Sequence, residues 1–293
     1  IRRSGAVTQR LKSLSEENET LHSSTDIGIA CSRRELADAY GLIYRQYRRY
    51  GYMDASPLRM RVLFWNALPG SVTVVARRGD RVIGTLTCIM DSEAGLPMDE
   101  AAPGPLNRLR SSGRRLCEVS GLAVDPELSD ASTLMEMIRF IVPLSTESLG
   151  ATDWVITVNP RHSGFYRRIL GFEAIGETVR YHKVKNAPGI PLRRDLTRMA
   201  DDFRKQHGHR TGRRNLFRRF FKDNRTFLNR KIAAGMYARS CLLSMDFLHT
   251  FYGYQCRVLE DISEYAVFCR LWIDEWIRHE SKDEEQRAEK TAG

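Results

Sequence analysis

Residues 32–187 alternate between stretches of helical periodicity and short β-branched runs. Two of these runs, 71–78 and 81–90, flank a Gly-Asp turn and predict a hairpin. The elements expected in order are helices at 32–51 and 56–69, the hairpin, a polar loop with three prolines, a strand at 115–124, a helix at 131–149 kinked by Pro143, a strand at 153–158, a helix at 162–170 and one or two strands within 172–184. This order predicts an α/β fold with a mixed central sheet and crossover helices.

The chain changes character after Pro188 and Pro191, where β-type runs become rare and helical stretches continue. We therefore expect a domain boundary near residue 190. The expected organisation is a flexible N-terminal tail at 1–26, an α/β domain at 27–190, a basic and mostly helical extension at 191–280, and a charged, disordered tail at 281–293.

The sequence predicts neither a membrane span nor a metal site. Its apolar runs are well short of the roughly 18 residues that a spanning helix needs, and its first residues are too polar for a signal peptide. The six cysteines include no C-x-x-C pair and have no His at metal-ligand spacing. These features predict a cytoplasmic protein with reduced cysteines and no metal.

The positive charge is concentrated in one region. The whole chain carries a formal charge of +10, and segment 193–231 alone holds fourteen Lys and Arg residues against four Asp. Its basic residues alternate with aromatic ones, as in RRNLFRRFFKDNRTFLNRKI. Such a segment fits docking to an acidic protein, an amphipathic helix that holds the enzyme at a membrane surface, or nucleic-acid binding. Nucleic-acid binding is the least favoured of the three.

Three motifs follow one another in the α/β region: CEVSGLAVDP, WVITVNP and GFYRRILGFE. In the GNAT acyltransferase superfamily, a strand ending in LAVDP leads into a helix, and a later FY…LGFE helix-turn closes the acyl-donor site. The matching segments here are Leu122 to Pro126 and Phe165 to Glu173. The chain therefore resembles GNAT acyltransferases over residues 32–187, and the resemblance implies a GNAT-like sheet followed by a separate helical extension.

A narrower resemblance rests on LRSSGRRLCEVSGLAVDP and on YRQYRRYGYMD upstream of it. Both segments are similar to long-chain N-acyl amino acid synthases of the FeeM type, which are relatives of the acyl-homoserine-lactone synthases. Both families carry an Arg on the first helix and a Glu before the AVDP element, and Arg45 and Glu118 occupy those places here. The resemblance implies transfer of a long-chain acyl group from acyl carrier protein to the α-amine of an amino acid, with tyrosine as the candidate acceptor.

Two other functions stay open at this point. One is an acyl-homoserine-lactone-type synthase, which is disfavoured because that family's pattern of acidic residues and Trp after the first helix is missing. The other is a non-catalytic GNAT-like module that binds a membrane or nucleic acid through the basic extension. Retention of Glu118, Tyr166 and Asn159 argues against such a module.

The residues after Pro126 depart from the GNAT pattern. Coenzyme A-dependent members have a Gly-rich loop there, whose N–H groups bind the pyrophosphate together with the following helix N-terminus. The corresponding stretch here, ELSDASTLMEM, contains no Gly or Arg and places Glu127 and Asp130 near the phosphate position. We therefore expect no bound cofactor, and a donor whose 4′-phosphopantetheine is carried by an acyl carrier protein. The resemblance implies the same donor.

Attack of an amine on a thioester needs a base, donors for the oxyanion and a proton for the leaving thiolate. The resemblance implies that Glu118 is the base, although a structural ion pair with Arg45 or Arg115 would also explain this carboxylate. Tyr166 matches a tyrosine that can protonate the thiolate, and it would suit the core of a helix equally well. The oxyanion donors are expected among the backbone N–H groups of Gly121, Leu122 and Ala123.

Arg45 is the expected partner of the acceptor carboxylate, since a guanidinium binds a carboxylate through two parallel hydrogen bonds. Asn159 either binds the pantetheine amide or caps the helix that follows it. The other residues expected to bind substrate are Tyr44, Ser120 and Trp65. Docking of the carrier protein is expected on Arg108, Arg110, Arg114, Arg115, Arg218 and Arg219.

Overall fold

The computed structural model describes the backbone of residues 25–291 and their side chains, except those of Arg213 and 279–291. The centre of this part is an eight-stranded mixed sheet, which confirms the expected fold class. Its strands are β1 (Asp26–Ile29), β2 (Ser71–Arg78), β3 (Arg81–Met90), β4 (Leu116–Val124), β5 (Asp153–Val158), β6 (Glu173–Ala174), β7 (Val179–Tyr181) and β8 (Ala187–Asp195). They lie in the order β1-β2-β3-β4-β5-β8-β6, with β7 paired to β8. Among these pairs only β4 and β5 run parallel.

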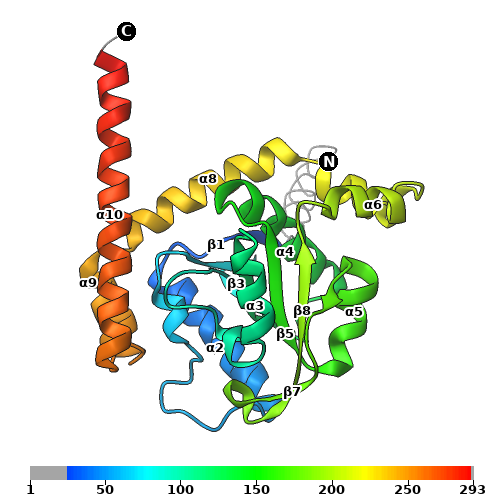
Figure 1. Cartoon of the computed structure of the whole chain (residues 1–293), viewed down its shortest axis with the longest axis horizontal. Helices are drawn as coiled ribbons and strands as arrows, with labels where there is room; N and C mark the ends of the chain where they lie inside the picture. Colours follow the sequence, from blue (N-terminus) through cyan, green and yellow to red (C-terminus); the bar gives the residue numbers. More distant parts are fainter. Residues whose placement is uncertain (1–24, 292–293) are drawn as a thin grey trace, which may run out of the picture.

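Helices connect and cover these strands (Figure 1). Before β8 they are α2 (Arg33–Arg49), η1 (Phe64–Ala67), η2 (Pro97–Glu100), α3 (Pro103–Ser111), α4 (Ala131–Pro143), η3 (Leu144–Ser148), α5 (Pro160–Leu170) and η4 (His182–Val184). After β8 they are α6 (Met199–His207), η5 (Gly212–Arg214), α7 (Leu216–Phe221), α8 (Arg225–Leu242), α9 (Met245–Phe247), η6 (Leu248–Gln255) and α10 (Ile262–Thr291).

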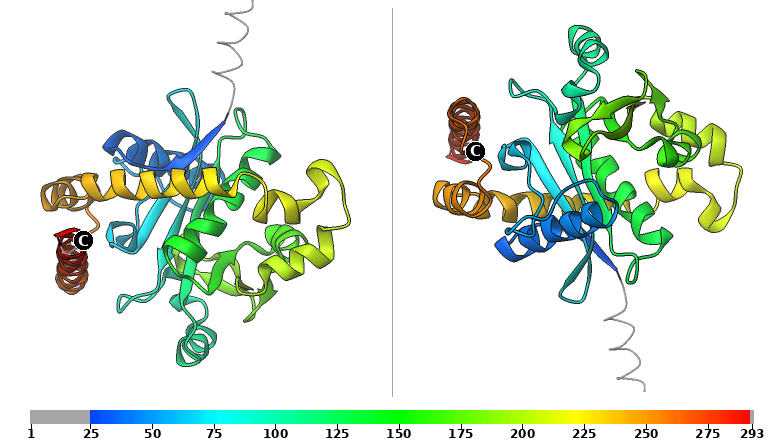
Figure 2. Two further views of the ribbon diagram at one scale, coloured as in Figure 1. Left: turned by 90° about the horizontal axis from the view of Figure 1, so that it is seen from above. Right: turned by 90° about the horizontal axis from the view of Figure 1, so that it is seen from below.

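The helices after β8 pack against both faces of the sheet. On one face, α4 shares a core with buried residues of α6, α7 and α8, including Phe203, Phe220 and Ile232. On the other face, α2 shares a core with η6 and α10, through Phe251 and Trp272. Helix α8 crosses the edge of the sheet at β1, and the C-terminal half of α10 projects beyond the body (Figures 1 and 2). The extension is therefore part of the hydrophobic core.

Strands β4 and β5 separate part of the way along their length. Their pairing is limited to three positions and ends at Glu118, opposite Val155. On the far side of β4, the pairing with β3 is interrupted between Thr85 and Thr87. This irregularity contains Gly121, whose φ of +62° suits glycine because it has no Cβ to clash with the backbone. The sheet consequently opens between the C-terminal halves of its two central strands.

The helix predicted at 56–69 is mostly wrong. Only the short η1 forms there, and Arg59 adopts a φ of +50°, which no α-helix accommodates. The segment is instead held by tertiary contacts, such as the hydrogen bond from the backbone N–H of Arg61 to the carbonyl of Tyr40. The predicted proline-rich loop also contains a helix, α3, which begins at Pro103, a position that tolerates a missing N–H.

The boundary expected near residue 190 falls inside β8, which pairs with β5 from Ile190 to Asp195. Pro191 fits this strand because its carbonyl still accepts a hydrogen bond, here from the N–H of Ile175. The expected N-terminal tail lies outside the described residues up to residue 24, and β1 begins at Asp26. Residues 281–291, where a disordered tail was expected, continue α10. None of the helices in the described part of the chain has the length and apolarity needed to cross a bilayer.

Candidate active site

A cavity of about 620 Å³ lies where β4 and β5 separate. Both strands line it, β4 from Glu118 to Val124 and β5 at Trp154 and from Ile156 to Val158. Residues of α2, α4, α5 and β8 complete the wall. A substrate in this cavity could therefore contact exposed backbone of two strands and side chains from both faces of the sheet.

The two sides of the cavity differ in polarity. On the α4 side the lining is apolar and includes Leu134, Ile138 and Ile141, which belong to the same core as Phe172. On the α2 side the lining is polar and aromatic, with Tyr47, Tyr50, Tyr52, Arg61 and Tyr181. The cavity can thus hold a long apolar group and a polar group at the same time.

Glu118 lies at the point where the two strands part, and only 3% of it is exposed. Its Oε2 accepts a 2.7 Å hydrogen bond from the backbone N–H of Met98. No Lys or Arg in the described part of the chain forms an ion pair with it, and both Arg45 and Arg115 are exposed to solvent. Burial raises the pKa of this carboxyl group to about 8. The alternative that the sequence left open, an ion pair with Arg45 or Arg115, is not what holds Glu118, and its raised pKa brings its titration closer to neutral pH.

Tyr181 is a neighbour of Glu118 that the sequence did not single out. Its hydroxyl donates a 3.0 Å hydrogen bond to the carbonyl of Pro97, and its ring lines the cavity. Burial and then the negative charge of Glu118 raise its pKa, whereas Arg61 lowers it. Tyr181 therefore lies within electrostatic reach of both side chains. Its local sequence, a strand residue before His182, carries no signal for this position.

The predicted oxyanion donors lie on the wall of the cavity. Gly121 and Leu122 have no partner position on β3, because the register passes from Ser120 to Ala123. They have none on β5 either, because that pairing ends at Glu118. A Cβ on Gly121 would come within 3.1 Å of the side chain of Ile43, so a larger residue would be crowded there as well as strained by the positive φ. Ser120 also lines the cavity.

Tyr166 lines the cavity from α5. Its ring packs at right angles to those of Phe165 and Phe172, and burial, together with Tyr47, raises the pKa of its phenol to about 12. Asn159 caps this helix by accepting a hydrogen bond from the N–H of Arg161, and it also lines the cavity. Tyr166 is therefore both a packed aromatic and a hydroxyl within reach of a ligand.

Three predicted substrate-binding residues do not line the cavity. Arg45 is exposed on α2, and Tyr44 accepts a hydrogen bond from the N–H of Ser56. Trp65 donates to the carbonyl of Gly95 and packs beneath Lys183. The side of α2 that faces the cavity carries Gln46, Tyr47 and Tyr50. Arg45 lies two positions from Tyr47, and residues at that spacing occupy different faces of a helix.

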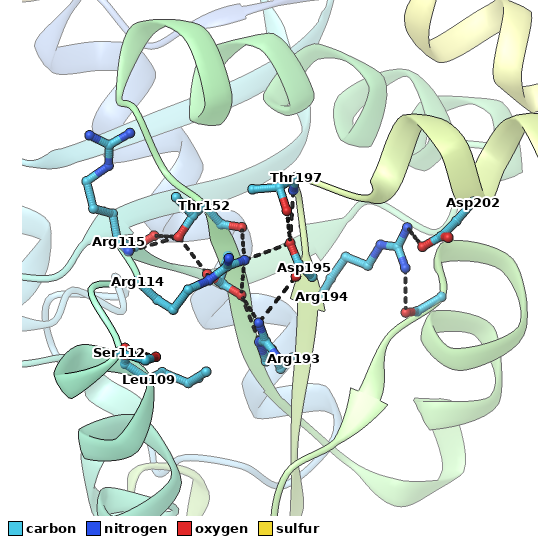
Figure 3. Close-up of polar contacts among 12 residues, drawn as sticks. Leu109, Ser112, Arg114, Arg115, Thr152, Arg193, Arg194, Asp195, Thr197 and Asp202 are labelled. Atoms are coloured by element: carbon cyan, nitrogen blue, oxygen red, sulfur yellow. Dashed lines mark hydrogen bonds and ion pairs between the residues drawn. The ribbon is translucent and has the colours of Figure 1, made fainter.

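The six arginines expected to dock a carrier protein fall into two groups. Three are held by internal carboxylates: Arg110 pairs with Asp91 and Asp99, Arg114 with Asp153 and Asp195, and Arg219 with Glu136. Figure 3 shows Arg114 and Arg193 converging on the acidic cluster of Asp153 and Asp195, while Arg115 points away from this cluster. Arg108 and Arg115 are exposed, and Arg218 is exposed beside Asp223. Of the six, Arg108 and Arg115 could bind a partner without breaking an ion pair in the described part of the chain, whereas Arg218 would have to leave Asp223.

The N-terminus of α4 already holds a negative charge. Asp130 caps this helix and accepts hydrogen bonds from the hydroxyl of Ser132 and the backbone N–H of Thr133, which lower its pKa to about 2. The carboxylate occupies the place where a helix N-terminus would otherwise bind a phosphate. Within the described residues, no group of three or more His, Cys, Asp and Glu could hold a metal ion.

Comparisons with known proteins relate this geometry to one group of enzymes. Residues 38–195 match the family model described as N-acyl amino acid synthase FeeM. The structure is similar to that of FeeM, an N-acyl amino acid synthase from uncultured soil microbes, at 26% sequence identity and a TM-score of 0.54, covering 61% of this chain and 94% of that one. It also resembles the AHL synthase LasI (13% identity, TM-score 0.45, 59% and 89% covered) and the CoA-dependent acyl-homoserine lactone synthase MesI (16%, 0.46, 64% and 97%). None of the curated protein sequences matches the chain.

Proposed function

Because this chain belongs to the FeeM family of N-acyl amino acid synthases and is an acyltransferase, we propose that it acylates the α-amine of an amino acid. The acyl donor in this proposal is a long-chain thioester on the 4′-phosphopantetheine arm of an acyl carrier protein. One observation carries the proposal: Glu118, a buried carboxyl group that forms no ion pair with any described residue, lies where two strands part beside a cavity of about 620 Å³.

Glu118 is the proposed base that takes a proton from the acceptor ammonium. An ordinary carboxylate, with a pKa near 4.3, is a weak base toward an amine. Burial raises the pKa of Glu118 to about 8, much closer to that of an amine. A base whose pKa lies near the working pH transfers protons most efficiently. The amine freed in this way attacks the thioester carbonyl and forms the new C–N bond.

The tetrahedral intermediate places a negative charge on the former carbonyl oxygen. Backbone N–H groups of Gly121, Leu122 and Ala123 are the proposed donors to this oxyanion, because the separated strands leave the first two without partners in the sheet. Collapse of the intermediate breaks the C–S bond. The attacking nitrogen loses its second proton, and the departing thiolate takes up one proton, so the step balances.

Tyr166 is the proposed hydrogen-bond donor to the leaving sulfur. A phenol with a pKa of about 12 remains protonated at neutral pH. Full proton transfer to a thiolate, whose conjugate acid has a pKa near 8.5, would be uphill by roughly 5 kcal/mol. A hydrogen bond that stabilises the developing thiolate fits these values better, and solvent or the protonated Glu118 can deliver the proton.

The preference for a carrier protein over coenzyme A is supported by the carboxylate of Asp130 at the N-terminus of α4. A pyrophosphate placed there would meet a like charge in place of free N–H groups. The exposed arginines Arg108 and Arg115 remain available to an acidic carrier protein, and Arg218 is exposed but pairs with Asp223. They lie outside the cavity wall, so their part in docking is a separate element of this proposal.

The polarity of the cavity suggests how the two substrates are placed. The apolar α4 side, with Leu134, Ile138 and Ile141, suits the acyl chain. The α2 side carries three tyrosines and suits an aromatic amino acid, so tyrosine is the proposed acceptor.

The test is a thiol-release assay on the purified protein with lauroyl-loaded acyl carrier protein or lauroyl-coenzyme A, each with a pool of the twenty amino acids. Mass spectrometry of the products identifies the acceptor. We expect release from the carrier protein together with an N-lauroyl amino acid. Turnover with coenzyme A alone would refute the proposed donor, and the absence of turnover with both donors would refute the proposed reaction.

A further inference from the structure

Arg61 is a half-buried arginine on the polar side of the cavity that pairs with no carboxylate in the described part of the chain. One of its N–H groups donates a 2.9 Å hydrogen bond to the backbone carbonyl of Lys183. Its guanidinium carbon lies 4.7 Å from the centre of the Tyr47 ring, a cation–π contact. These two contacts hold the guanidinium in place and leave most of its five N–H donors uncommitted.

A guanidinium held in this way is suited to bind an anionic ligand. Partly desolvated cations normally pair with a carboxylate, and no carboxylate of the described side chains lies within ion-pair distance of Arg61. Its planar N–H groups match the geometry of a carboxylate better than an ammonium would. The carbonyl of Lys183 and the ring of Tyr47 occupy one edge and one face, so a ligand carboxylate would approach from the cavity.

Arg61 and the proposed base line the same cavity and are connected through one segment. Arg61 donates to the carbonyl of Lys183, and Tyr181, two residues earlier, donates to the carbonyl of Pro97, next to Met98, whose N–H binds Glu118. An α-amino acid carries its amine and its carboxylate on the same carbon, so the groups that bind them must lie a few ångströms apart across a small space. We infer that Arg61 binds the α-carboxylate of the acceptor and thereby positions its amine at Glu118. This inference rests on the proposed function.

Two other arginines are less suited to this role. Arg45, the residue expected from the sequence, is exposed and lies outside the cavity wall. Arg161 lines the cavity, but it is exposed and donates to the hydroxyl of Tyr52 and to Nε2 of His162. It therefore lies at the solvent-exposed rim, whereas Arg61 lies in the part that contains Tyr47 and Tyr181.

The experiment compares two acceptors in wild-type protein and in Arg61→Gln. The acceptors are the amino acid identified in the thiol-release assay and its primary amide, which lacks the carboxylate charge. We expect the wild type to prefer the acid in kcat/KM, and Arg61→Gln to lose about 10- to 100-fold toward the acid while activity toward the amide stays nearly constant. The two acceptors also differ in the basicity of their amines. This difference is the same for every variant, so it cancels when the acid-to-amide preference of the variants is compared.

The matched control is Arg59→Gln, which removes an exposed charge two residues away and outside the cavity wall. It should keep the wild-type preference for the acid. Arg61→Lys retains the charge without the planar fork and should restore part of the preference, which a purely structural role of Arg61 would not predict.

Three results would overturn the inference. Arg61→Gln could fold, as judged by circular dichroism, and keep the full preference for the acid. The preference could instead disappear in Arg45→Gln or in Arg161→Gln. Since each of these results requires a wild-type enzyme that turns over, they are distinct from failure of the proposed function, in which no acceptor is acylated.

Discussion

The backbone N–H of Met98 donates a 2.7 Å hydrogen bond to Oε2 of Glu118 and so links the β3–β4 connection to the proposed catalytic base. This connection is itself held in place. Asp99 accepts a hydrogen bond from the N–H of Leu96, and Arg110 bridges Asp99 and Asp91. Glu118 is therefore oriented before any substrate enters, as expected of a group that must meet an amine in a defined direction.

Glu118→Gln should abolish most of the acyl transfer. The amide keeps the size of the side chain and an oxygen that can accept from Met98, but it cannot take up a proton. We expect kcat to fall by about 10² to 10⁴-fold, measured as thiol release from the acyl donor under saturating acceptor. Glu177→Gln, at an exposed position outside the cavity wall, is the control and should retain wild-type activity. Full activity of the Glu118 variant would show that another group is the base.

The same carboxyl group should make stability depend on pH. Its pKa rises from 4.5 in the unfolded chain to about 8 in the folded one, so the folded state binds more protons between these values. Stability contributed by the protonated group is complete below pH 4.5 and is lost as the pH rises through 8. Between pH 5 and 9 the free energy of unfolding should fall by roughly 4 kcal/mol more in the wild type than in Glu118→Gln. Urea denaturation of both proteins at pH 5 and at pH 9 measures this difference. An equal change in the free energy of unfolding of the two proteins would contradict the raised pKa.

Tyr166→Phe should slow the departure of the thiolate while preserving the packing with Phe165 and Phe172. We expect kcat to fall by about 10- to 100-fold with the natural thioester, because a hydrogen bond to a charged sulfur is lost. The loss should shrink with an aryl thioester, whose thiolate is a better leaving group. A constant loss across a series of leaving groups would assign Tyr166 to binding or packing.

Asp130→Asn tests the donor preference. Asparagine also caps helices, so α4 should keep its N-terminus while losing the negative charge. Removal of this charge should raise kcat/KM for acyl-coenzyme A relative to acyl carrier protein by roughly 2- to 5-fold, in line with the energy of a charge at a helix end. An unchanged ratio of the two specificity constants would mean that Asp130 does not exclude the phosphates.

Phe251→Ala should destabilise the whole protein. Phe251 is fully buried in the core shared by α2, η6 and α10, beside Tyr40. Truncation of a buried Phe costs about 3–5 kcal/mol. Tyr254→Ala, three residues away and 88% exposed, should change stability by less than about 0.5 kcal/mol. Denaturant unfolding measures both, and a two-step transition in which only one step responds would show that the extension unfolds separately.

Much of the active-site region could be predicted because its signals are local. The GLAVDP and FYRRILGFE motifs identified β4, α5 and the positions of Glu118, Gly121 and Tyr166, and all three residues line one cavity. Alternating or helical periodicity identified most of the elements between α2 and α5. The second predicted helix failed because four apolar residues at helical spacing are too weak a signal to outweigh the tertiary contacts of this segment.

The sequence by itself predicted the α/β fold class and the strands β2 to β5, since these depend on neighbouring residues, and its resemblance to a known family pointed to Glu118. Only the tertiary structure decided that β8 pairs beside β5, that the extension packs on both faces of the sheet, and that Arg61 lines the cavity while Arg45 does not. It also decided that Glu118 is buried without an ion pair to any residue that the structure describes, and this burial raises its pKa. These properties depend on contacts between residues far apart in the chain and on which side of a helix or loop faces inward, and no local pattern encodes them.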